Sequence, residues 1–198
     1  GATFAAEFLV AALEVFGLAE FLQFLWHRAN PWMRPLDGAQ IAASQEVHPS
    51  GLIPYWMVRV DYGSLAARLA AQFSPGSSTD LWTQITGGPG SQFRAVTPMH
   101  VIHTGPSMDE QLAVHELTHV GQYELIGARY MPQAIHAQIA GRGYDYNDNP
   151  YGSLAAAAAA DATFTEFNRE QQAQICEDFY CARRGLGVRF HGALADLE

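Results

Sequence analysis

The sequence predicts an α+β fold in which a small mixed β-sheet packs on two helices that share one site. A His-Glu-x-x-His run, from His115 to His119, lies in a stretch of helical character. Short segments rich in β-branched and aromatic residues precede it, at 55–60, 92–97 and 99–104, and a carboxylate-rich helix follows about fifty residues later. The 198 residues suffice for one domain with a buried core.

Residues 3–27 are the most apolar run of the chain and predict a helix. About 20 apolar residues can cross a bilayer. Three glutamates interrupt this run, however, and an ionised acid at mid-bilayer costs about 2.5–3.5 kcal/mol. A signal peptide is not expected, because no basic start precedes the apolar residues. We therefore separate an N-terminal helix, residues 1–30, from a domain at 31–198. We expect this helix to be buried or covered by a protein partner, with membrane association as the alternative.

Proline and glycine divide the next part of the chain into short elements. Before the His-Glu-x-x-His run, the sequence predicts a helix at 38–44, a strand at 55–60, a helix at 64–73, a surface loop at 74–91, and strands at 92–97 and 99–104. The outward face of 99–103 would offer an edge on which a peptide binds by strand addition.

The helix that carries the His-Glu-x-x-His run is predicted to begin at a capping box. Ser107 and Glu110 lie three residues apart, which is the spacing of such a box. The helix is expected to continue to Gln122 or Glu124 and to end near Gly127, because glycine commonly follows the last helical turn.

Helix geometry brings the two histidines of the run together. Positions i and i+4 lie on one face, so His115 and His119 can both direct a ring nitrogen at one metal ion, with Glu116 beside them. Two neutral imidazoles, an open coordination position and a carboxylate that takes a proton from water are what a zinc hydrolase requires. No H-x-x-G-x-x-H continuation supplies a third histidine after His119.

The third ligand is expected to be a glutamate on the last long helix. A capping box of Thr163 with Glu166 predicts that this helix begins there and runs to about Tyr180. Its glutamates can share one face, and we rank Glu170 first, Glu177 second and Glu166 third as the ligand.

Charge and cysteine content exclude other classes of function. The 11 basic residues are all arginines, and 20 acidic residues bring the net charge to −9, which argues against nucleic-acid binding. Cys176 and Cys181 do not form a C-x-x-C pair, so a thiolate zinc site is not expected.

Three segments resemble the gluzincin-type metallopeptidase domains of bacterial secreted toxins and injection-system-associated proteins. Residues 112–123 are similar to the H-E-L-T-H-V-x-Q signature of those domains, and residues 168–180 are similar to their downstream E-Q-Q-A helix. Residues 143–146 resemble the segment that connects the two. The chain departs from the group at Gly121, where the group often has tryptophan, and its N-terminal helix has no counterpart in the resemblance.

This resemblance implies a zincin-like fold, Zn²⁺ held by His115, His119 and Glu170, and Glu116 as the general base. We therefore expect a zinc-dependent metallopeptidase that hydrolyses peptide bonds of a peptide or protein substrate. The tetrahedral oxyanion of that reaction also requires a hydrogen-bond donor. Of the three candidates Tyr144, Tyr146 and His136, we select Tyr146.

The alternative is an accessory or structural subunit of the same fold, with a vestigial or purely structural zinc site. It would bind a membrane complex or a protein partner through residues 3–27. The apolar N-terminal helix separates the two interpretations, because a secreted peptidase has little use for it. An extracytoplasmic or membrane-associated location is favoured in both.

Overall fold

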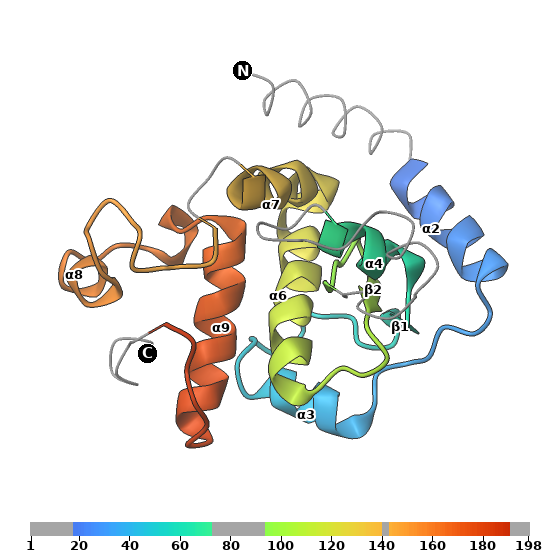
Figure 1. The fold of residues 1–198 in the computed structure, drawn as a ribbon, viewed down its shortest axis with the longest axis horizontal. Coiled ribbons are helices and arrows are strands. Elements are labelled where there is room, and N and C mark those ends of the chain that lie inside the picture. The colour runs from blue at the N-terminus through green and yellow to red at the C-terminus, as the bar shows by residue number, and fades with distance from the viewer. Residues whose placement is uncertain (1–17, 73–93, 140–142, 191–198) are drawn as a thin grey trace.

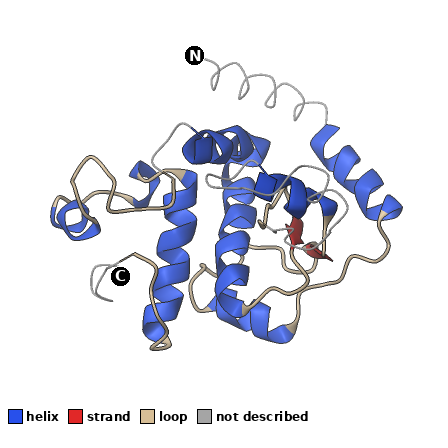
Figure 2. Cartoon of the chain, in the orientation of Figure 1, coloured by secondary structure: helices blue, strands red, loops and turns tan. Residues whose placement is uncertain are grey.

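A computed structural model describes residues 18–72, 94–139 and 143–190, which are mostly helical with one small sheet (Figure 1, Figure 2). The elements in chain order are α2 (Leu18–Ala29), α3 (Gly38–Gln45), β1 (Arg59–Tyr62), α4 (Leu65–Gln72), β2 (Val101–Thr104), α6 (Glu110–Ile126), the 3-10 helix η1 (Gly127–Arg129), α7 (Tyr130–Ile139), α8 (Leu154–Ala159), the 3-10 helix η2 (Phe164–Glu166) and α9 (Arg169–Arg183). The predicted mixture of helix and strand is confirmed.

The N-terminal apolar run is described only in its second half. Residues 3–17 of the predicted helix lie outside the described residues, and the rest of the run falls within α2. Among the helices that the structure describes, none combines the length and the apolar character needed to cross a membrane.

The sheet is smaller than predicted. β1 and β2 pair in parallel, from Arg59 opposite Val101 to Tyr62 opposite Thr104, and α4 lies on the connection that parallel strands require. The strand predicted at 55–60 is wrong over residues 55–57, which form a turn. The strand predicted at 92–97 is reduced, within its described residues, to one antiparallel bridge between Val96 and His103.

α6 is the central helix of the molecule (Figure 1). Every residue from Ala113 to Tyr123 is buried, because α3 and α9 pack against the helix and apolar side chains of the sheet join it in one core cluster. One side, which includes Leu117 and Val120, joins the apolar core beneath the sheet. A helix that is buried on all sides must find partners for its polar residues within the protein. His115, Glu116 and His119 are therefore largely enclosed by protein atoms.

α9 runs antiparallel to α6 along most of its length (Figure 1). Near one end of the pair, Gln122 Nε2 donates to Gln172 Oε1 at 3.0 Å. Near the other end, the hydroxyl of Tyr180 contacts the carboxylate of Glu110. This arrangement places the first turn of α9 beside the histidines of α6.

The residue predicted to cap the start of α6 is wrong. Asp109, and not Ser107, caps the helix: its side chain accepts from the backbone N–H of Leu112 at 2.8 Å. Glu110, the other member of the predicted box, is the first residue of the helix and bonds to Tyr180 instead. The predicted end near Gly127 is confirmed, since Gly127 is the C-cap with φ 69°.

The predicted start of α9 is also corrected. Thr163 and Glu166 do form a capping box, but it closes only the single turn of η2, because the chain becomes extended at Phe167 with ψ 148°. α9 begins after Asn168, whose side chain accepts from the backbone N–H groups of the first turn. Glu166 therefore does not lie on the helix that carries Glu170.

Gly121 has a packing role on α6. A Cβ added at this position would lie 3.1 Å from Cδ2 of Leu52, which belongs to the loop after α3. A larger residue at this position would therefore require the side chain of Leu52 to move.

Candidate metal centre

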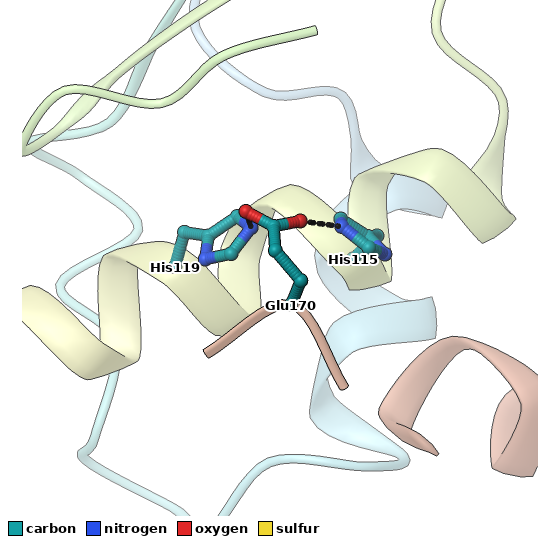
Figure 3. Close-up of side chains that lie close together, drawn as sticks. All are labelled: His115, His119 and Glu170. Atoms are coloured by element: carbon teal, nitrogen blue, oxygen red, sulfur yellow. Dashed lines mark ion pairs between the residues drawn. The ribbon is translucent and has the colours of Figure 1, made fainter. Parts of the chain in front are cut away.

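Three buried side chains from α6 and α9 converge on one point (Figure 3). Nε2 of His115 lies 3.6 Å from Oε2 of Glu170, and Nε2 of His119 lies 3.6 Å from Oε1 of the same carboxylate. The ligand atoms of the three residues all lie within 4.8 Å of one another. Ligand atoms bound to one tetrahedral zinc at about 2.0–2.2 Å lie about 3.3–3.6 Å apart. This His-His-Glu group can therefore hold a metal ion.

The capping of α9 orients the carboxylate. Glu170 is in the first turn, and its backbone N–H donates to Oδ1 of Asn168 at 2.9 Å. Its side chain is only 2% exposed. An acid with so little exposure is rare in proteins unless it is paired or binds a metal.

The second nitrogen of each imidazole has a defined partner. Nδ1 of His115 lies 3.0 Å from Oε2 of Glu177, and Nδ1 of His119 lies 2.8 Å from Oε1 of Gln122. Gln122 donates through Nε2 to the carbonyl of Arg169 and to Oε1 of Gln172, both at 3.0 Å, so its Oε1 is an acceptor. In the neutral ring each Nδ1 therefore carries the proton, and each Nε2 keeps its lone pair for a metal.

The surrounding carboxylates favour positive charge at this point. Burial alone would lower the pKa of His115, but the nearby carboxylates of Glu170 and Glu177 outweigh it and raise the pKa to about 10. Burial likewise opposes protonation of His119, yet the charge of Glu170 raises its pKa. Burial would raise the pKa of Glu170, and the two histidines hold it well below its usual range. The carboxylates that raise the pKa values of the histidines create a negative potential at this point, which also attracts a metal cation.

Replacement of Glu177 by glutamine is expected to weaken zinc binding by about 10–100-fold, because the carboxylate that orients His115 and raises its basicity is lost. The measurement is competition for zinc against a chelating dye, with the unfolding temperature as a check on folding. Glu46→Gln is the matched control, since this glutamate pairs with Arg184 at the surface. Equal zinc affinity of Glu177→Gln and wild type would contradict the assigned role.

Glu116 borders the same cavity as the three ligand residues. The cavity has a volume of about 110 Å³, and His115, Glu116, His119 and Glu170 all line it. Glu116 is 4% exposed, and its Oε2 accepts a hydrogen bond from Oγ1 of Thr97 at 2.6 Å. A carboxylate held in this way beside a metal can take up and release a proton.

The open edge of the sheet is not where the sequence predicted it. β2 is buried along its length and bonded on both sides, to β1 and, through His103, to Val96. The predicted strand addition on 99–103 is therefore wrong. Both backbone hydrogen bonds of Val96 go to His103. The N–H and C=O groups of its neighbours Ala95 and Thr97 therefore point away from β2. Both neighbours line the cavity.

The structure does not bring Tyr146 to the cavity. Its side chain is fully buried, and its hydroxyl donates to Oδ2 of Asp178 at 2.8 Å and contacts the carbonyl of Phe190. Tyr144 and Tyr130 line the cavity instead. Burial raises the pKa of both hydroxyls, so they keep their protons at neutral pH.

The remaining candidates separate by their position. Glu177 supports a ligand without belonging to the triad, whereas Glu166 is exposed and contacts Tyr151 and Thr163. His136 lies exposed on α7.

Sequence reasoning missed Thr97, Tyr130 and Gln122. Of these, only Gln122 could have been found from the sequence. It lies three residues after His119, so helix geometry places the two side chains next to each other.

No protein-family model, no curated protein and no solved structure matches this chain. The gluzincin resemblance therefore remains a prediction carried by residues 112–123, 143–146 and 168–180. The structure independently shows that α6 and α9 bring His115, His119 and Glu170 together as a possible metal-binding group.

Proposed function

We propose that the protein is a zinc-dependent metallopeptidase with a zincin-like fold, which hydrolyses peptide bonds with Glu116 as the general base. The observation that carries the proposal is the buried His-His-Glu group with Glu116 in the same cavity. Two imidazoles and one carboxylate are a ligand set of catalytic zinc sites, which leave one coordination position for water or substrate. When bound, zinc supplies Lewis acidity, which lowers the pKa of water and polarises a carbonyl group.

The residues of the cavity have distinct parts in this mechanism. Glu116 takes a proton from the attacking water and passes it to the leaving amine, while Thr97 holds its carboxylate in place. The backbone groups of Ala95 and Thr97 can pair with an extended peptide, which would bind as an added strand. Tyr130 and Tyr144 replace Tyr146 as candidate donors to the oxyanion.

One observation favours the alternative of an accessory subunit. On α2, four large apolar side chains are 45% to 57% exposed: Phe21, Phe24, Leu25 and Trp26. An exposed apolar patch of this kind is typical of a surface that binds a protein partner or a membrane. In this interpretation the metal centre would be structural.

Metal removal tests the proposal. Zinc-loaded protein is expected to cleave an unfolded substrate protein. A chelator should stop this cleavage and added zinc should restore it, because zinc supplies the Lewis acid of the reaction. Mass spectrometry of the fragments is the measurement. One zinc bound per chain without any cleavage would overturn the peptidase proposal and favour the accessory subunit.

A further inference from the structure

A second cavity, of about 490 Å³, lies beside the metal centre and differs from the first in its charge. Both cavities are lined by His115 and Glu116, so the two meet at the metal centre, and Arg94, Ala95 and Tyr144 also line both. The first cavity extends between apolar side chains such as Met131 and Ile135. A substrate bound at the metal centre would therefore find chemically different surroundings in the two cavities.

Two arginines line the second cavity, and one of them, Arg189, does not line the first. Cζ of Arg94 lies 5.2 Å and Cζ of Arg189 lies 5.1 Å from the centroid of the Tyr144 ring. Arg94 also donates a hydrogen bond to the hydroxyl of Tyr144. The Tyr144 ring in turn lies 5.7 Å, between centroids, from the ring of His115. Both guanidinium groups are thus held next to one metal-ligand residue.

Both carboxylates of this cavity have hydrogen-bond partners other than the two arginines. Glu177 accepts from His115, and Glu116 accepts from Thr97. Among the described residues, Arg189 has no ion-pair partner; its guanidinium reaches Oε1 of Gln174 at 3.4 Å. Its backbone N–H donates to Oδ1 of Asp178 at 3.0 Å, which holds the residue in place while the side chain stays exposed. In a chain of net charge −9, this pair of arginines is a local site for an anion.

We propose that the second cavity is a carboxylate subsite, in which Arg94 and Arg189 bind an acidic group of the substrate. The group is either an Asp or Glu side chain or the terminal carboxylate of a peptide, since the planar guanidinium matches both in the same way. The first cavity, with its apolar side chains, takes an apolar side chain of the same substrate. That the ligand is a peptide rests on the proposed peptidase function.

Binding of hydroxamate-capped peptides to the zinc-loaded protein tests this subsite without requiring cleavage. The hydroxamate group binds zinc and fixes one end of each peptide at the metal centre. Three peptides are compared, which carry glutamate amide, glutamine amide, or glutamine with a free terminal carboxylate. Each is made in both chain directions. A carboxylate is expected to tighten binding about tenfold over glutamine amide, as a charge-assisted hydrogen bond provides. The tighter of the two acidic probes identifies the source of the carboxylate. Calorimetry gives the affinities.

Variants at Arg189 complete the test. Arg189→Gln is expected to reduce the tenfold preference to about twofold, and Arg189→Glu to reverse it, because the charge at the cavity is removed or inverted. Arg183→Gln is the matched control: this exposed arginine also stacks on an aromatic ring, with Cζ 5.5 Å from the centroid of Phe179, and lines neither cavity.

Equal binding of acidic and neutral probes by wild type, an unchanged preference in Arg189→Gln, or failure of all probes to bind would overturn the subsite. An acidic preference without cleavage of any peptide would leave the subsite standing and remove only the peptidase proposal.

Discussion

Replacement of Glu116 by glutamine is expected to abolish peptide hydrolysis while zinc remains bound. Glutamine has nearly the same shape and can still accept the hydrogen bond from Thr97, but an amide cannot accept a proton from water. General-base catalysis contributes about 10²–10⁴-fold to such reactions, so the rate is expected to fall by at least that much. The measurement is the initial rate of fragment formation, together with the zinc content of the purified variant.

Glu124→Gln provides the control for this variant. Glu124 lies on the same helix, contacts His100 and lines neither cavity beside the metal centre. It should retain both zinc and activity. A Glu116→Gln protein that cleaves at the wild-type rate would exclude Glu116 as the base. Loss of zinc from that variant would show that Glu116 holds the site together instead.

The part of the site that follows from helix geometry could be predicted from the sequence. His115 and His119 share a face because they are four residues apart, and this relation holds wherever the helix packs. The start of the second helix could not be predicted in the same way. Thr163 and Asn168 both begin good capping boxes, and only the extended backbone at Phe167 decides that the long helix follows the second. That decision removes Glu166 from the helix and leaves Glu170 in its first turn.

Loop residues were beyond the reach of sequence patterns. Tyr144 and Tyr146 lie two residues apart in a loop without periodicity, so nothing local indicates which one faces the cavity. Asp178 on α9 decides it by accepting a hydrogen bond from Tyr146. The open edge of the sheet is a similar case. Alternation within 99–103 indicates a strand, but it does not show which segments pair with its two edges. One partner is β1, from a distant part of the chain, and the other is the nearby Val96.

Replacement of Glu170 by alanine is expected to remove most zinc binding and with it the stabilisation that zinc confers. A ligand that binds only the folded protein stabilises it by about 2.7 kcal/mol at a concentration of 100 times its Kd. Wild type should therefore unfold at a higher temperature when zinc is added. Glu170→Ala should not, because two histidines without the carboxylate lack the third protein ligand that catalytic zinc sites have. Calorimetric unfolding with and without zinc, and the zinc content after dialysis, are the measurements.

Glu166→Ala is the decisive comparison. Both glutamates were candidate third ligands from the sequence, but only Glu170 lies beside the two histidines in the structure. Glu166 is exposed and bonds to Tyr151 and Thr163, so its loss should leave zinc content and the zinc-dependent rise in unfolding temperature unchanged. Loss of zinc in Glu166→Ala together with retention in Glu170→Ala would mean that the last helix begins at Thr163 and that α9 is placed wrongly against α6. If both variants retained zinc, the metal would lie elsewhere, and the buried carboxylate of Glu170 would serve only to pair with His115 and His119. The expected result, loss of zinc in Glu170→Ala alone, follows because Glu170 is the residue that, within the described part of the chain, forms a metal-binding group with both imidazoles.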